Sequence, residues 1–156
     1  MRNIRYVQDS DRAFWYSLDH ALPREQFDQK VRNKMGCVLL VEGISVGLLR
    51  YNLFWDEHPF CTMLHVKNEY QRKGYGRALM DFWENDMRDS GYKLLLTSTQ
   101  VDEQAQHFYR KLGYQEAGSL LITVPEFQQP MEMFLSDPPK PPTVCPLKWV
   151  STSMES

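Results

Sequence analysis

The chain has 156 residues, a formal net charge of −2, 42% hydrophobic residues and 13% aromatic residues. This composition is too apolar for a disordered chain, and the sequence lacks the run of about twenty apolar residues that would span a membrane. A chain of this length buries enough surface to form a core without metal or disulfide staples. We therefore expect one soluble domain, with no membrane partner and no metal.

The N-terminus and the cysteines both indicate a cytoplasmic protein. Residues 1–6 pass directly into mixed polar sequence, without the apolar core of about seven residues that a secretion signal needs. Cys37, Cys61 and Cys145 are odd in number and widely spaced. That pattern is typical of reduced structural thiols rather than of a disulfide scaffold or a metal pair.

In the first half of the chain, strand patterns surround two helices. Residues 4–7 have strand character, and the acidic and hydroxyl side chains of residues 9–11 can cap a helix that reaches about residue 19. A second helix follows Pro23. Three apolar runs come next, and the first two predict an antiparallel hairpin because a short turn separates them; the runs are residues 37–41, 46–53 and 60–66.

The second half changes period. Leu79, Phe82, Trp83 and Met87 form an apolar helical stripe that ends near Gly91. Leu94, Leu95 and Leu96 then predict a strand that is covered on both faces and parallel to a neighbour, which makes the sheet mixed. A further helix opens at Asp102, carries Ala105, Phe108, Tyr109 and Leu112 on one side, and ends at Gly113, after which strand character resumes at Tyr114.

The C-terminal segment differs in composition from the rest. Five of the nine prolines lie within residues 137–146, and proline resists both helix and ladder pairing. We divide the chain into a domain of residues 1–136 and a proline-rich tail of residues 137–156. The tail is either disordered or packs on the domain or a partner through Leu147, Trp149 and Val150.

The stretch that carries chemistry is the loop of residues 67–77, between the expected strand and helix. A loop that enters a helix presents backbone N–H groups without intrahelical partners, and the helix dipole adds partial positive charge, so the position suits a phosphate. Gly74 and Gly76 allow close approach of a ligand to the main chain. The charge of this segment is +3, four positive side chains minus one negative, from Lys67, Arg72, Lys73 and Arg77 against Glu69. The loop indicates an anionic ligand, although the charges alone also fit a solvated basic face.

Two motifs resemble one known family. Gln71-Arg72-Lys73-Gly74-Tyr75-Gly76 matches the signature Gln/Arg-x-x-Gly-x-Gly/Ala of the GNAT superfamily, the acetyl-coenzyme A dependent N-acetyltransferases. Residues 102–114 are similar to the second signature of that family, with Phe108-Tyr109 in place and Gly113-Tyr114 where the family commonly has Gly-Phe. The nucleoside triphosphate loop is absent, and Leu79 stands where a dinucleotide or kinase pattern needs a third glycine. The resemblance covers about residues 2–135 and is sharp from about 60 to 115.

The resemblance implies an α/β (α+β) fold whose mixed central sheet has six to seven strands, is splayed at the cofactor site and is flanked by about four helices. It implies acetyl-coenzyme A as co-substrate and no metal. The pantetheine arm would bind along Leu64, His65 and Val66. The phosphates would bind at the loop, with Gln71, Arg72, Lys73, Gly74, Tyr75, Gly76 and Arg77 as the residues involved.

The second motif implies roles for two residues. Tyr109 matches the family tyrosine near the cofactor sulfur, where a phenol can protonate the departing thiolate; its alternative is a tyrosine of the apolar face. Asp102 stands where many relatives have asparagine. Ionised aspartate only accepts hydrogen bonds, so Asp102 is either a helix cap alone or a cap that also contacts the cofactor.

The acceptor amine must lose a proton before it attacks. For a lysine-like amine with a pKa of about 10.4, presenting the free base at pH 7 costs roughly 4.6 kcal/mol. Many relatives have a glutamate on the strand before the loop, but Met63 occupies that position. His65 is the nearest titratable candidate for the base, and its alternative is a side chain that faces a helix or solvent. We expect direct attack on the thioester through a tetrahedral intermediate, with the oxyanion held by a strand amide near Val66.

The acceptor itself cannot be read from these residues, and small amines, aminoglycosides, polyamines and peptide termini all fit. Several aromatic residues either form the wall of the acceptor site or belong to the core, namely Trp15, Tyr16, Phe27, Phe54 and Trp55, and the turn at 124–130 is a further candidate for this wall. Residues 56–58 either line the acceptor cleft or form a solvated loop. A coenzyme A binding module without catalysis is the main alternative. The basic surface is too small for a nucleic-acid partner. Edge strands and the apolar end of the tail would permit a homodimer.

Overall fold

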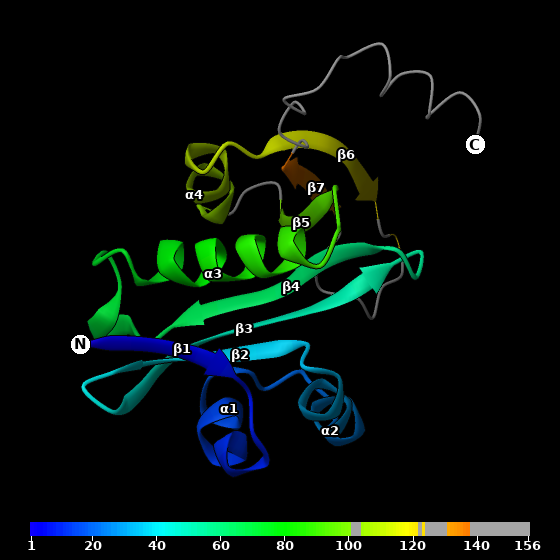
Figure 1. Cartoon of the computed structure of the whole chain (residues 1–156). Helices are drawn as coiled ribbons and strands as arrows, with labels where there is room; N and C mark the ends of the chain where they lie inside the picture. Colours follow the sequence, from blue (N-terminus) through cyan, green and yellow to red (C-terminus); the bar gives the residue numbers. More distant parts are fainter. Residues whose placement is uncertain (101–103, 122, 124–130, 138–156) are drawn as a thin grey trace.

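The structure is a computed structural model that describes residues 1–100, 104–121, 123 and 131–137 (Figure 1). Its strands are β1 (Arg2–Tyr6), β2 (Gly36–Val41), β3 (Ile44–Phe54), β4 (His58–Val66), β5 (Leu95–Gln100), β6 (Gln115–Leu121) and β7 (Met131–Asp137). Its α-helices are α1 (Arg12–Leu18), α2 (Arg24–Asn33), α3 (Tyr75–Asp89) and α4 (Ala105–Lys111), and two short 3-10 turns are η1 (Asp9–Asp11) and η2 (Asn68–Tyr70). Asp102, Cys145 and the tail beyond residue 137 lie outside the described residues.

All seven strands form one sheet in the order β1-β2-β3-β4-β5-β7-β6. Every neighbouring pair is antiparallel except β4 and β5, which are parallel. The crossover between these two strands is α3, so the apolar helix and the three leucines that follow it produce the mixed sheet that their pattern predicts. The expected six to seven strands and about four helices are confirmed.

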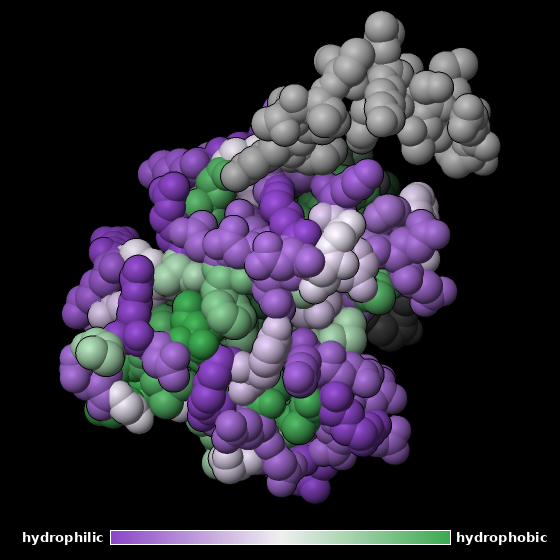
Figure 2. All heavy atoms as spheres, viewed as in Figure 1, coloured by the Kyte–Doolittle hydropathy of each residue, from purple (hydrophilic) through white to green (hydrophobic). Residues whose placement is uncertain are grey.

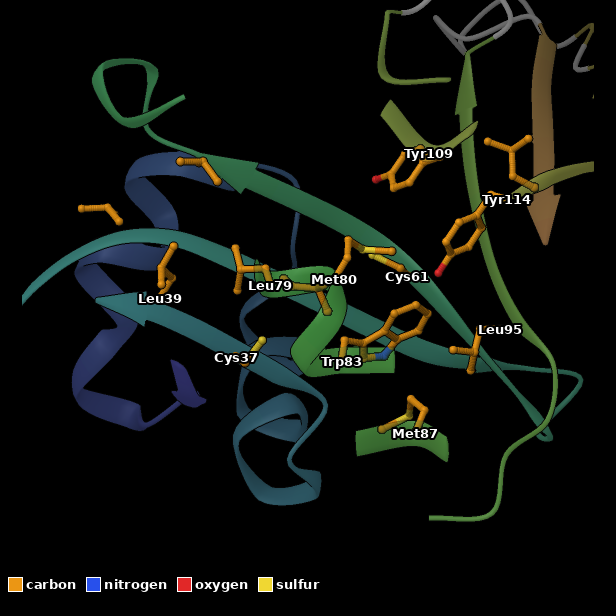
Figure 3. Close-up of a cluster of buried hydrophobic side chains, with 14 of the residues drawn as sticks. Cys37, Leu39, Cys61, Leu79, Met80, Trp83, Met87, Leu95, Tyr109 and Tyr114 are labelled. Atoms are coloured by element: carbon orange, nitrogen blue, oxygen red, sulfur yellow. The ribbon is translucent and has the colours of Figure 1, made fainter. Parts of the chain in front are cut away.

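Two hydrophobic cores lie on opposite faces of this sheet, since neighbouring residues of β2 belong to different cores. α3 and α4 cover one face, where Figure 3 shows Leu79, Met80 and Trp83 packed toward the strands. α1 and α2 cover the other face over β1 to β3 (Figure 1). There Trp15 and Phe27 are fully buried, so these two aromatics belong to the core.

The outer surfaces of the helices are polar. Figure 2 shows hydrophilic side chains over α2 and most of this view, with hydrophobic ones visible between α3 and the N-terminal strand. Within the described ranges, none of the helices combines the length and apolar character needed to cross a membrane.

Candidate active site

The sheet opens between its two parallel strands. β4 and β5 pair only at Phe60 with Leu96 and at Cys61 with Thr97, although β4 continues to Val66 and β5 to Gln100. Beyond Cys61 and Thr97 the two strands therefore separate. The splay that the family resemblance implies lies at this point.

A cleft of about 410 Å³ occupies the opening. β4 contributes residues 61–64 to its walls, β5 contributes Thr97, Ser98 and Thr99, and α4 with the residue before it contributes Gln104, Ala105 and Tyr109; β7 contributes Glu132. Main-chain and hydroxyl groups thus surround a space in which β4 and β5 are too far apart to form hydrogen bonds with each other. Such a space suits a ligand that supplies its own hydrogen bonds.

A β-bulge in β4 decides which side chains face which side. Arg50 pairs with Met63 and Tyr51 pairs with Cys61, so Thr62 is the extra residue. Cys61 belongs to the core under α3, whereas Met63 packs with the core under α1 and α2. The bulge shifts the alternation by one residue, and the rest of β4 keeps the new phase.

The backbone of β4 presents alternate amides to the opening. Lys67 N donates to Val46 O at 2.8 Å, and His65 pairs with Leu48, so both residues direct their main-chain groups to β3. The N–H groups of Leu64 and Val66 then point toward β5, where the ladder has ended. Of the three residues predicted to line the pantetheine arm, Leu64 and Val66 have this orientation and His65 does not.

The predicted phosphate loop follows β4 and ends at the start of α3. Gly74 is the N-cap of α3 with φ of 83°, in the left-handed region that favours glycine. Ala78 N donates to Gly74 O at 3.0 Å, which is the first intrahelical bond. The N–H groups of residues 74–77 therefore have no acceptor within the helix, and they lie at the positive end of its dipole.

The loop is bonded to the end of β4 on one side, and its basic side chains are exposed. Gln71 Nε2 donates to Val66 O at 2.8 Å, so this side chain ties the loop to the end of β4. Arg72, Lys73 and Arg77 are exposed and are available to an anion. A Cβ added at Gly76 would lie 3.5 Å from the Phe108 ring, so the first turn of α3 lies beside α4, the helix that carries Tyr109.

Tyr109 lies in the cleft on the α3 and α4 face of the sheet. It is 6% exposed, its ring centroid lies 5.8 Å from that of Tyr114, and Figure 3 shows its hydroxyl pointing away from Tyr114. Tyr114 is engaged elsewhere, because its hydroxyl donates to Glu84 Oε2 at 3.0 Å. Burial, followed by the charge of Glu84, raises the pKa of Tyr114 well above its ordinary value.

The two cysteines within the described ranges are buried thiols without a disulfide. Burial is the main cause that raises the pKa of Cys61 to about 12, and burial likewise raises the pKa of Cys37. At neutral pH both are neutral thiols and poor nucleophiles. Residues 1–100, 104–121, 123 and 131–137 contain no cluster of three or more metal-ligating side chains.

The remaining predicted residues are spread apart. His65 shares the α1 and α2 face with Met63, is partly buried, and is not among the residues that line the cleft. Asp56 and Glu57 lie exposed in the turn between β3 and β4. Phe54, Trp55 and His58 line a second, apolar groove of about 300 Å³ with Phe60 and Phe134.

Sequence reasoning missed the contributions of β5 and β7 to the cleft, namely Thr97, Ser98, Thr99 and Glu132. A signal for Glu132 existed, since it is the single acid in the apolar run of residues 131–135. The strand position of this run, however, was not predicted. Ser98 and the two threonines look like ordinary strand residues until the splay is known.

A helix N-terminus with unpaired N–H groups, a splayed parallel pair and a tyrosine in the opening form the arrangement expected of an acetyl-coenzyme A dependent acetyltransferase. The acetyltransferase (GNAT) family model matches residues 4–114, and the chain belongs to that family. It is therefore an acyltransferase that uses acetyl-coenzyme A.

Known proteins are similar to this chain in sequence or in fold. An aminoglycoside N(6′)-acetyltransferase type 1 from Stenotrophomonas maltophilia is 27% identical over 147 residues, covering 83% of this chain and 94% of that protein. The crystal structure of Ard1 from Thermoplasma volcanium has a TM-score of 0.78 at 18% identity, covering 89% of this chain and 98% of the other. Naa50 from Arabidopsis thaliana, in complex with the bisubstrate analogue CoA-Ac-MVNAL, has a TM-score of 0.75 at 14% identity, covering 86% and 97%.

Proposed function

We propose that the protein transfers the acetyl group of acetyl-coenzyme A to a primary amine by direct attack of the amine on the thioester. The observation that carries this proposal is the opening between β4 and β5, which has strand amides on one side and Tyr109 on the other. The opening leads to the N-terminus of α3 through the short loop after Val66. Acyl transfer needs the strand amides, Tyr109 and the N-terminus of α3 within the length of one coenzyme.

In this proposal the loop binds the phosphates of the coenzyme. The N–H groups of residues 74–77 meet the pyrophosphate, and the exposed side chains of Arg72, Lys73 and Arg77 offset the charge of the pyrophosphate and 3′-phosphate. Leu64 and Val66 take the pantetheine amides as an added strand would. Because Gln71 already donates to Val66 O, we assign Gln71 to holding the loop.

The chemical step requires stabilisation of an oxyanion and protonation of a thiolate. In this proposal the Val66 N–H donates to the oxyanion of the tetrahedral intermediate, and Tyr109 protonates the departing sulfur. The two groups belong to different elements, β4 and α4. His65 stays a candidate base that would have to act from the α1 and α2 face.

The acceptor is a primary amine, and two classes rank first. The 27% identical relative is named for the 6′-amine of aminoglycosides, and the Naa50 structure contains an analogue that joins coenzyme A to a peptide. The apolar groove of Phe54, Trp55, Phe60 and Phe134 extends the β7 side of the cleft and would form a wall for the acceptor. A coenzyme-binding module without catalysis is the alternative that Met63 supports, because methionine cannot serve as a base.

A thiol-release assay with acetyl-coenzyme A tests the proposal. The amine panel includes an aminoglycoside with a free 6′-amine, a polyamine and a peptide with a free N-terminus. We expect thiol release above the amine-free rate with at least one class, and mass spectrometry should find one added acetyl group. Acetyl-coenzyme A binding without transfer to any amine would favour the binding module instead.

A further inference from the structure

We propose that Glu132 is the carboxylate that receives the acceptor ammonium in the cleft and takes its proton. The inference rests on the proposed N-acetyltransferase function and goes beyond it, because it names a base on β7 in place of the residue that Met63 replaces. The inference also implies that the acceptor amine enters the cleft as a cation.

Glu132 is located on β7 at the edge of the opening. In register it lies opposite Gln100 of β5 and Leu120 of β6, and it lines the same cleft as Met63 and Tyr109. Ser98 Oγ donates to Glu132 Oε1 at 2.7 Å. This bond fixes the carboxylate against β5, the strand that separates from β4.

The second oxygen of this carboxylate lacks a partner. Glu132 Oε2 is buried and accepts no hydrogen bond among the residues that the structure describes. A buried carboxylate oxygen without a donor is costly, and such groups persist where a ligand or catalysis uses them. An ammonium supplies the donor and the opposite charge that Oε2 needs.

The cleft passes through the sheet, and Glu132 lies on the opposite side from Tyr109. Met133 and Leu135 belong to the core under α3 and α4, and side chains alternate along a strand, so Glu132, which directly precedes Met133, faces the other way. Tyr109 belongs to the α3 and α4 core. The amine would therefore approach from the Glu132 side while the sulfur leaves toward the Tyr109 side.

The proton balance follows from this placement. The ammonium gives one proton to Glu132, and the nitrogen lone pair forms the C–N bond to the thioester carbon. The C–S bond breaks with its electron pair on sulfur, which takes the proton of the Tyr109 hydroxyl. The second nitrogen proton restores the Tyr109 phenol, and Glu132 releases its proton to water.

Few charges oppose an ammonium at this position. Among the residues that line the cleft, the titratable ones are Glu132, Tyr109 and Cys61, and the partners in register, Gln100 and Leu120, carry no charge. Arg110 of α4 contacts Met133 Sδ at 3.7 Å, so its guanidinium is on the face opposite to Glu132. β4 contributes Thr62, Met63 and Leu64, and none of them titrates.

The test is the pH dependence of kcat/KM for Glu132→Gln, measured with an aminoglycoside that has a free 6′-amine and with a peptide that has a free N-terminus. In the wild type the carboxylate takes the proton of the bound ammonium, so kcat/KM should be nearly independent of pH below the pKa of the amine. The variant depends on free amine from solution, and its kcat/KM should rise about tenfold per pH unit up to the pKa of the amine. At pH 7 we expect a loss of about 10²-fold or more.

Three controls separate this role from a structural one. Gln still accepts the Ser98 hydrogen bond, so acetyl-coenzyme A affinity by calorimetry should stay within about threefold of wild type. Glu132→Asp keeps the charge, so part of the pH-independent range of kcat/KM should return. Glu116→Gln, on exposed β6, should behave as wild type.

Each outcome decides the assignment. A flat profile in Glu132→Gln, or a loss below about threefold at pH 7, overturns it. If the wild type binds acetyl-coenzyme A and acetylates neither probe, the proposed function fails. The role of Glu132 as the ammonium site is then tested by measuring how tightly the aminoglycoside binds to the coenzyme A complex. Binding weakened at least tenfold in Glu132→Gln supports the carboxylate as the ammonium site, and equal or undetectable binding in both proteins overturns it.

Discussion

Tyr109 and Tyr114 show how neighbouring tyrosines receive different tasks. Their ring centroids are 5.8 Å apart, yet the Tyr114 hydroxyl is bound to Glu84 while Tyr109 lines the cleft. The Phe-Tyr and Gly-Tyr motif located both residues from sequence. The resemblance singled out Tyr109, and the tertiary structure shows that Tyr109 lines the cleft while Tyr114 does not.

The first prediction concerns the proposed acid. Tyr109→Phe removes the phenol proton but keeps the ring that packs in the core, so turnover should fall about 10²-fold or more while acetyl-coenzyme A affinity changes little. Steady-state kinetics and calorimetry measure the two effects. Tyr92→Phe, a partly buried tyrosine at the end of α3, is the matched control, and unchanged turnover in Tyr109→Phe would rule out the role.

Lys30 gives a second prediction at this scale. It is 7% exposed on α2, its Nζ donates to Tyr51 O, and burial, with a smaller contribution from the charge of Arg50, lowers its pKa from 10.5 to about 8. Between these two values the unfolded chain holds more protons than the folded one, so stability should rise as pH increases from about 8 to 10.5.

Lys30→Met should abolish this rise, which we expect to be on the order of 1–3 kcal/mol. Urea unfolding from pH 7 to 10 measures the free energy in both proteins. Lys93→Met, at an exposed lysine after α3, should retain the wild-type slope. Parallel pH profiles for the wild type and Lys30→Met would contradict the prediction.

At the scale of elements, the start of α3 combines a conformation and a charge. Gly74 has φ of 83° and a Cβ there would meet nothing within 4 Å, so a substitution strains the backbone rather than the packing. The glycine pattern alone predicted this helix start. The reason is local, because a helix cap and its unpaired amides depend on adjacent residues.

Gly74→Val should weaken acetyl-coenzyme A binding by about tenfold or more, since a β-branched residue disfavours the left-handed region by roughly 1–2 kcal/mol and the amides would reorient. Isothermal calorimetry measures the affinity. Gly43→Val, in the β2–β3 turn at φ of 78° with equally open space, carries the same strain away from the site. Equal affinities in both variants would show that the cap does not bind the phosphates.

The bulge in β4 lies at the same scale but was not predictable. Nothing in the residues 61–64 themselves marks Thr62 as the extra one; the register against β3 does. Arg50 Nε donates to the fully buried Asp19 at 2.7 Å, and its Nη1 donates to Thr62 at 2.9 Å. These bonds tie the bulge to the residue that ends α1, so its position depends on three distant segments.

At the scale of the whole molecule, β6 forms one edge of the sheet in the part of the chain that the structure describes. It is the last strand of the sheet, every one of its residues is exposed, and Leu120 and Leu121 are 48% and 61% exposed. Unpaired strand edges favour association with another strand. We propose that two chains form a homodimer along β6.

Light scattering should then give twice the chain mass of 18.5 kDa for the wild type, and Leu121→Lys should give the monomer. Ile44→Lys, at an apolar residue that is 52% exposed at the start of β3, should remain dimeric. A monomeric wild type at micromolar concentration would refute the proposal.

The sequence by itself determined the family and the mixed sheet, and it marked the loop of residues 67–77 and Tyr109 as candidate site residues, because each depends on local spacing or on neighbours in the chain. The tertiary structure alone decided at which residues β4 separates from β5, the phase of β4 after Thr62 and the presence of Glu132 and Ser98 in one cleft. Ser98 and Glu132, for example, are 34 positions apart in the chain, and Cys61 and Thr97 are 36 positions apart. Pairing across a sheet is set by the packing of all its strands, so no single segment encodes it.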